Sequence, residues 1–493
     1  MSMYEIQGGR PLGGRLRVQG AKNSVLPLLA AALLAPGQSV IHNCPDLSDV
    51  SATLDILALL GCRVAREGET VTVDAAALRG SAIPERLMRE MRSSVIFLGA
   101  LLARTGSARL CYPGGCELGP RPIDLHLAAL RGLGAEIRED GECLTCTAGR
   151  GLRGARIHLP FPSVGATENA MLCACGAQGV TTLVGAAREP EIVDLERFLN
   201  KLGARVSGAG TPVVTIEGGR PLHGAEHTVM GDRIVASTWL CACGAAGGEI
   251  ALTGVEPSSL DTVLSCLEQA GGELECRGEE IHFRSTKPLR GIPPVHTAPY
   301  PGFPTDAQAI LMAALLRCRG AAVFEENLFS SRYRHVDELA RMGADIRVSG
   351  RTAVVLGVER LHGAVVRCTD LRGGAALCAA ALAAEGETSI SDITHIDRGY
   401  QSIEDDLAAL GADMVAMAES KELMEKGFLT TSCCPAFVTY VRKNFPELLE
   451  HVSHNLSPMA AISQRIKEAD PEAKVVFIGP CTAKKLEEVG AKV

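Results

Sequence analysis

Apolar helical stretches and strand-like stretches alternate along the chain in a repeated order. Segments such as SVLPLLAAALLAPGQSVI, from Ser24, and AQAILMAALLRCRGAAVF, from Ala307, each run from an Ala- and Leu-rich helix through a glycine into a strand-like stretch. Glycine suits the position that follows the last turn of a helix. Shorter alternating runs, such as residues 70–73, predict the strands of hairpins. The pattern therefore predicts a mixed α/β protein.

One short phrase, with a glycine between a helix end and a strand, recurs six times at intervals of roughly 70 residues. Its copies read LLGCRV, GLGAEI, KLGARV, QAGGEL, RMGADI and ALGADM, with the glycines at Gly61, Gly134, Gly203, Gly271, Gly343 and Gly411. A fixed period of this kind is the mark of a repeated structural unit. We therefore expect six copies of one βαβαββ-type unit.

Six such units exceed the usual size of one domain, so the simplest division is into two lobes of three units. Loop-rich sequence at residues 226–233 marks the exchange between them, and the first twenty residues, with a strand at 16–18, join the later units. We expect lobe one to comprise residues 1–21 and 230–412, and lobe two residues 22–229. Ligands commonly bind in the cleft between two such lobes.

Composition narrows the function classes. The hydrophobic content of 46% and charged content of 22% are those of a globular protein, and the net charge of −8 provides no overall positive field for nucleic acid or an anionic membrane. The apolar run at residues 25–35 is too short to span a bilayer. Eighteen cysteines without an export signal indicate reduced thiols and a cytoplasmic protein. Cys143 and Cys146 have no second pair at zinc spacing, so we expect no metal there.

The loop CYPGGCELGPRPIDLH, from Cys111, carries the clearest candidate chemistry. Cys116 follows two glycines, which permit close approach of a ligand, and Arg121 lies between two prolines, which stiffen the segment. A thiol in such a loop is exposed, and its pKa can be tuned by its neighbours. Considered alone, Cys116 is better explained by an unreactive cysteine in a surface turn.

Charged and polar residues recur where the predicted helices begin. They are Lys22 and Asn23, Arg92, Asp232 and Arg233, Asp306, and Asp370 and Arg372. Unpaired amides and the positive end of the helix dipole make helix N-termini suitable for phosphates. The residues alone therefore predict a two-lobed protein that binds a phosphorylated ligand, either an enzyme or a non-catalytic binding scaffold.

Longer motifs add a family resemblance over residues 3–413. The motifs include GAKNSVLPLLAAALL, MRSSVIFLGALLAR, PGGCELGPRPIDLHL, PSVGATENAML, GFPTDAQA, TDLRGGAAL and IDRGYQSIEDDLAALGAD. In these motifs the chain resembles the UDP-N-acetylglucosamine 1-carboxyvinyltransferase family of enolpyruvyl transferases. The resemblance implies a two-lobed inside-out α/β barrel and transfer of enolpyruvate from phosphoenolpyruvate to the 3′-hydroxyl of UDP-N-acetylglucosamine, the first committed step of peptidoglycan precursor synthesis. It also implies no cofactor and a monomer or weak homo-oligomer.

The same resemblance implies roles for individual residues. Cys116 would protonate the methylene carbon of phosphoenolpyruvate, Asp306 would be the base, and Asn23 would face the sugar hydroxyl. Lys22, Arg121 and Arg398 would hold the phosphate and carboxylate groups. The residues expected against the nucleotide sugar are Arg92, Arg121, Pro122, Ile123, Asp124, Leu125, Ser163, Val164, Gly165 and Leu328, and those expected to line the same cleft are Arg233, Arg332, Asp370 and Arg372. Phe161 departs from the family pattern, because some members have a lysine there beside the diphosphate.

Residues 413–493 break the repeat and resemble a fragment of the iron-only hydrogenase catalytic domain. Two of that family's three cluster motifs are present, in TSCCPAF and GPCTAKKLE, and imply Cys434 and Cys481 as cluster ligands. Two of four thiolates cannot hold a four-iron cluster securely, so we expect no bound cluster and no hydrogenase activity. The arrangement suggests a fusion, with an iron–sulfur redox protein as one alternative function. The other is a shikimate-3-phosphate enolpyruvyl transferase, against which the PGGC loop and RPIDLHL favour the sugar nucleotide.

Overall fold

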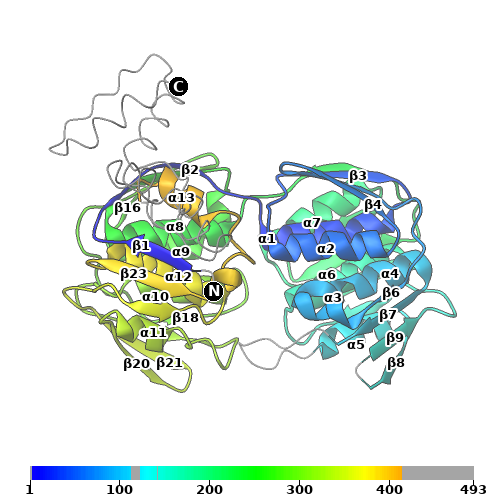
Figure 1. Ribbon diagram of the computed structural model, residues 1–493. Coiled ribbons are helices and arrows are strands. Elements are labelled where there is room, and N and C mark those ends of the chain that lie inside the picture. Colours follow the sequence, from blue (N-terminus) through cyan, green and yellow to red (C-terminus); the bar gives the residue numbers. More distant parts are fainter. Residues whose placement is uncertain (1–2, 113–122, 142, 413–493) are drawn as a thin grey trace, which may run out of the picture.

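The computed structural model describes residues 3–112, 123–141 and 143–412, and for Glu90 and Arg92 it describes the backbone only. Two lobes lie side by side (Figure 1). The N-terminal strands β1 (Met3–Gln7) and β2 (Leu12–Arg17) belong to the same lobe as everything from α8 (Arg233–Ala246) onward. One hydrophobic core draws on residues 4–18 and 234–410, and the other on residues 21–229. The chain thus crosses between the lobes twice.

The predicted βαβαββ unit is seen clearly in the last unit of lobe two. Its order is β10 (Arg156–His158), α6 (Val164–Cys175), β11 (Gly179–Val184), α7 (Pro190–Lys201), β12 (Arg205–Ser207) and β13 (Val213–Gly218). β10 runs parallel to β11, and the hairpin of β12 and β13 adds to it antiparallel, which gives the sheet order β10-β11-β13-β12. Gly203 follows α7 with a φ of 98°, and all six repeat glycines have a positive φ, a conformation that costs glycine little.

The other two units of lobe two form sheets of the same strand arrangement. The first contains α1 (Lys22–Ala31), β3 (Gln38–His42), α2 (Ser48–Leu59), β4 (Arg63–Glu67) and β5 (Thr70–Asp74), and β14 (Glu226–Thr228) returns to pair with β3. The second contains β6 (Ala82–Ile83), α3 (Glu85–Glu90), α4 (Phe97–Thr105), β7 (Ser107–Cys111), α5 (Asp124–Gly132), β8 (Glu136–Asp140) and β9 (Cys143–Thr147). Each has a four-stranded sheet among the residues described.

Lobe one repeats the plan with one strand from the N-terminus in each of two sheets. β2 pairs with β15 (Gly248–Thr253), which is followed by α9 (Asp261–Gln269), β16 (Glu273–Arg277) and β17 (Glu280–Ser285). The next unit contains β18 (Val295–His296), α10 (Thr305–Ala314), β19 (Ala321–Glu325), α11 (Val336–Arg341), β20 (Asp345–Ser349) and β21 (Thr352–Leu356). The last contains β22 (Val365–Arg367), α12 (Leu371–Ala383), β23 (Glu387–Ser391) and α13 (Ile403–Ala409).

The sixth sheet differs from the other five. Its described part has three strands, in the order β1-β23-β22. β1 runs antiparallel to β23 from Met3 opposite Ser391 to Gln7 opposite Glu387, the place that a hairpin strand takes in the other units. The N-terminal strand β1 therefore covers the edge of β23 that faces a hairpin strand in the other units.

The helices are inside and the sheets outside, as the resemblance implied. In lobe one α8, α10 and α12 pack on one another, and every residue of α12 after its first is buried. A helix that is apolar on all sides belongs in a core, and the Ala, Gly and Cys residues of these helices let their backbones approach closely. In the part of the chain described here, no helix is both long enough and apolar enough to cross a bilayer.

Candidate active site

A cavity of about 610 Å³ opens between the lobes and is lined by residues of both. The first residues of five helices line it, namely those of α1, α5 and α6 from lobe two and of α8 and α10 from lobe one. The sequence-predicted residues that line it are Lys22, Asn23, Ile123, Asp124, Leu125, Ser163, Val164, Gly165, Arg233, Asp306, Leu328 and Arg398. The helix starts that the repeat placed at equivalent positions therefore meet in space, and their free amides provide a site suited to an anion.

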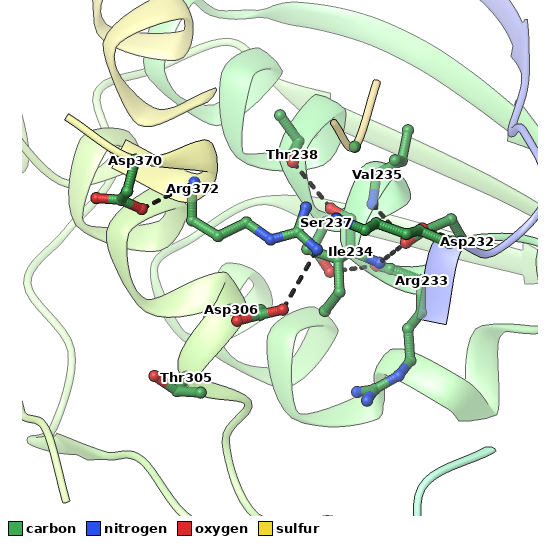
Figure 2. Close-up of polar contacts among 12 residues, drawn as sticks. Asp232, Arg233, Ile234, Val235, Ser237, Thr238, Thr305, Asp306, Asp370 and Arg372 are labelled. Carbon is green, nitrogen blue, oxygen red and sulfur yellow. Dashed lines mark hydrogen bonds and ion pairs between the residues drawn. The ribbon is translucent and has the colours of Figure 1, made fainter. Parts of the chain in front are cut away.

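Side-chain caps fix where two of these helices, α6 and α8, begin. Asp232 Oδ1 accepts the amides of Ile234 and Val235 at 2.8 and 3.1 Å, at the start of α8 (Figure 2). Its other oxygen accepts the amide of Lys22 at 3.0 Å. Asp232 thus caps a helix of lobe one and holds the first residue of α1 in lobe two. Ser163 caps α6 through the amide of Ala166.

Asp49 bridges two of the predicted anion ligands. Its Oδ2 lies 2.7 Å from Nζ of Lys22, and Arg398 donates to both carboxylate oxygens at 2.9 and 3.2 Å. Burial lowers the pKa of Lys22, and the charge of Asp49 opposes that shift. Burial also disfavours the charged form of Asp49, but Lys22 and Arg398 together hold the pKa of its carboxyl below the ordinary value. Two cations from different lobes are therefore kept together at the cavity wall.

Asp306 is fixed by two buried arginines. Arg332 Nη2 donates to Oδ1 at 2.8 Å, and Arg372 Nη2 donates to Oδ2 at 3.3 Å. Figure 2 shows Arg372 reaching from the start of α12 to Asp306. The side chains of Arg332 and Arg372 are 2% and 4% exposed, whereas the Asp306 side chain is 30% exposed. The carboxylate therefore faces the cavity in a defined orientation.

We expected Arg332, Asp370 and Arg372 to line the cavity, but none of the three does. Asp370 instead caps α12, accepting the amides of Arg372 and Gly373 at 3.0 Å each. Arg332 and Arg372 lie behind Asp306. The two arginines orient Asp306, and Asp370 fixes the start of α12, from which Arg372 extends. The sequence could not distinguish this arrangement from direct contact with a ligand.

Three glutamates that line the cavity, Glu168, Glu189 and Glu191, were not predicted from the sequence. Glu191 pairs with Arg233 across the lobes at 2.9 Å, with both side chains under 10% exposed. Glu189 accepts the amide of Tyr300 at 3.3 Å. Burial raises the pKa of Glu168 well above its ordinary value, and the charges of Glu191 and Glu189 add to the effect.

A sequence signal for Asp49 and Glu191 does exist. Each unit carries an acidic residue in the first turn of its second helix, where a negative charge is favourable. These residues are Asp49, Asp124, Glu191, Asp261, Asp337 and Glu404. Two of the six became partners of basic residues at the cavity.

Several predicted residues lie outside the described part of the chain. Cys116, Arg121 and Pro122 fall in the gap at 113–122, and Cys434 and Cys481 fall after residue 412. Arg92 begins a 3₁₀ helix, Arg92–Ile96, with only its backbone described. Phe161 lines the cavity and is 45% exposed. Among the described residues, no group of three or more His, Cys, Asp or Glu side chains is arranged to hold a metal ion.

Comparison with known proteins covers nearly the whole chain. Residues 6–407 match the family described as EPSP synthase (3-phosphoshikimate 1-carboxyvinyltransferase), and residues 398–492 match the iron only hydrogenase large subunit, C-terminal domain. UDP-N-acetylglucosamine 1-carboxyvinyltransferase 2 of Caldanaerobacter subterraneus is 47% identical over 84% of this chain and 99% of its own. UDP-N-acetylglucosamine 1-carboxyvinyltransferase 1 of Symbiobacterium thermophilum is 49% identical over 83% of this chain and 94% of its own.

Solved structures agree on the fold. The enolpyruvyl transferase NikO from Streptomyces tendae superposes with a TM-score of 0.74 at 29% identity and covers 84% of this chain and 98% of its own. EPSP synthase from Acinetobacter baumannii gives a TM-score of 0.66 at 21% identity, over 83% of this chain and 98% of its own. The resemblance expected from the motifs is confirmed, as is the hydrogenase-like character of the last segment.

Proposed function

The chain belongs to the UDP-N-acetylglucosamine 1-carboxyvinyltransferase family, and we propose that it transfers enolpyruvate from phosphoenolpyruvate to the 3′-hydroxyl of UDP-N-acetylglucosamine with release of phosphate. The observation that carries the proposal is the meeting of Lys22, Arg398 and Asp306 at a cavity where five helices begin. Cations and helix N-termini suit the phosphate and carboxylate groups of both substrates.

The carboxylate of Asp306 is the proposed base. In the addition step it takes the proton of the 3′-hydroxyl as the hydroxyl oxygen bonds to the central carbon of phosphoenolpyruvate. The methylene carbon takes a proton in the same step, and we propose Cys116 as its donor because the family resemblance implies that role. Elimination then removes a proton from the new methyl group and expels inorganic phosphate, which restores the double bond on the sugar. Positioned acids and bases of this kind contribute roughly 10²- to 10⁴-fold each.

Asp49 holds two of the proposed anion ligands together. Its carboxylate pairs with Lys22 of lobe two and with Arg398 of lobe one. An anionic substrate that binds between the lobes meets both cations, so its binding energy favours the closed arrangement of the two lobes. Closure excludes water from the reacting groups.

The shikimate phosphate acceptor is the competing proposal within the fold. The relatives at 47% and 49% identity are named for UDP-N-acetylglucosamine, whereas the EPSP synthase structure is 21% identical and supports the fold alone. Phosphate release measured with phosphoenolpyruvate and each acceptor in turn separates the two. We expect release with UDP-N-acetylglucosamine and none with shikimate 3-phosphate; the reverse preference would reject the proposal.

We also propose that this reaction serves peptidoglycan precursor synthesis in the cytoplasm, as the sugar-nucleotide acceptor implies. The hydrogenase-like residues 413–493 hold two of that family's three cluster motifs, and we propose that these residues by themselves do not hold a four-iron cluster.

A further inference from the structure

Two cysteines outside the cavity lie in direct contact. Cys111 ends β7 and Cys143 begins β9, and their sulfur atoms are 2.6 Å apart. The two residues lie directly opposite each other in the antiparallel ladder. Both are intermediate in exposure and neither is in a disulfide, so small molecules can reach two free thiols held side by side.

The alternation of side chains along β9 explains why Cys143 contacts Cys111 and not Cys146. Residues three apart on a strand point to opposite faces of the sheet. Cys146 is fully buried on the inner face, whereas Cys143 is on the outer face with Cys111. The C-x-x-C spacing is therefore incidental, and the register of β7 against β9 creates the thiol pair instead.

The cross-strand geometry is compatible with a disulfide. Directly opposed residues of an antiparallel pair have Cα atoms about 4.5–5.5 Å apart, which is within the range of about 4.4–6.8 Å that disulfides span. Closing the bond therefore needs a small side-chain movement and no change of register.

We propose that Cys111 and Cys143 form a reversible dithiol–disulfide site whose oxidant is a hydroperoxide. One thiolate attacks a peroxide oxygen and becomes a sulfenic acid, with release of water or an alcohol. The second thiol then attacks the sulfenic sulfur, the S–S bond forms, and a water molecule leaves. Two electrons pass from the two sulfurs to the peroxide, and an external dithiol returns the pair to its reduced form.

The electrostatics bear on the part that Cys111 plays. The pKa of Cys111 is raised to about 11, first by its hydrogen bond with Cys143 and then by burial. Cys111 therefore keeps its proton at neutral pH, which disfavours it as the first nucleophile. The site does not depend on the proposed transferase reaction, because neither residue lines the cavity.

Peptide mapping of the full chain tests the proposal. The protein is treated with hydrogen peroxide, the remaining thiols are alkylated, and tryptic peptides are analysed without reduction. We expect the peptide of Cys111 joined to the peptide of Cys143, lighter than their sum by two hydrogens and separated by dithiothreitol. Each of these peptides holds a second cysteine, Cys116 and Cys146, so fragment ions of the joined peptide must identify the bonded sulfurs.

Matched variants make the outcome decisive. Cys111→Ser and Cys143→Ser should each abolish the cross-link, whereas Cys116→Ser and Cys276→Ser should retain it. Cys276 is exposed and reports that the peroxide reached the protein. A cross-link that persists in Cys143→Ser, or a wild-type chain with oxidised Cys276 and no cross-link, overturns the proposal. If a variant fails to fold, the fragment ions from the wild-type chain alone decide between the four sulfurs.

Discussion

Asp406 accepts a hydrogen bond from the indole of Trp239, at 2.9 Å, inside lobe one. Burial raises the pKa of this carboxyl to about 7; the hydrogen bond opposes the shift, and the charges of Asp405 and Glu404 add to it. The carboxyl is therefore protonated in the folded protein at pH values where it is ionised in the unfolded chain. We predict that this single group makes the stability of lobe one depend on pH.

The sign follows from proton linkage. Between about pH 4, near the unfolded pKa, and pH 7, the folded state holds the extra proton, so the free energy of unfolding falls as pH rises. The contribution is complete below about pH 4 and is lost above pH 7. Three pKa units at about 1.4 kcal/mol each set a limit of about 4 kcal/mol, and because Asp406 is partly exposed we expect roughly 2–4 kcal/mol.

Urea denaturation followed by tryptophan fluorescence provides the assay, because Trp239 is the one tryptophan in the chain. Asp406→Asn keeps a neutral acceptor at all pH values. The stability difference between wild type and Asp406→Asn should therefore change by roughly 2–4 kcal/mol between about pH 4.5 and pH 8. Asp337→Asn, at an exposed position on α11, is the control and should keep the wild-type slope. A constant difference between wild type and Asp406→Asn would refute the reasoning.

Three further experiments test other parts of the account. Asp306→Asn should lower kcat by roughly 10²- to 10⁴-fold with a small effect on KM for the nucleotide sugar, measured by phosphate release; a change in KM alone would assign Asp306 to binding. Glu191→Gln breaks a buried ion pair and should cost about 3–5 kcal/mol of stability, whereas Arg15→Ala, in an exposed pair, should cost less than about 1 kcal/mol; equal losses in urea denaturation would contradict this contrast. Iron analysis of the purified full chain should find far less iron than a four-iron cluster requires, and a stoichiometric content would show that the last segment binds one.

The periodic features of the fold could be predicted from sequence. The recurring glycines gave the six units because a helix that ends in a left-handed residue needs glycine at the same place in each copy. The charged helix starts predicted the cavity, since equivalent helices of a repeated fold present equivalent ends. Both signals depend on residues that are close together in the chain, so they can be recognised in a single sequence.

Contacts between distant segments could not be predicted in the same way. The burial of Arg332 and Arg372 behind Asp306 depends on how α12 packs against α10, and no spacing in the sequence encodes that packing. The pairing of Cys111 with Cys143 depends on strand register, where a shift of one residue would have turned one sulfur to the other face. Asp49 was missed for a different reason. The acidic residue in the second helix of each unit can be recognised in the sequence, but the sequence does not show which basic residue pairs with it.

Phosphate release by wild type and Cys116→Ser, together with the equilibrium affinity of each for UDP-N-acetylglucosamine, tests the central claim most directly. The account predicts that the full chain releases phosphate only when phosphoenolpyruvate and UDP-N-acetylglucosamine are both present. Cys116→Ser should lose most of this turnover and bind the nucleotide sugar nearly as tightly as wild type. A wild-type chain without acceptor-dependent release, or a variant that loses binding and turnover equally, would contradict the assignment of Cys116 as the proton donor of an enolpyruvyl transferase.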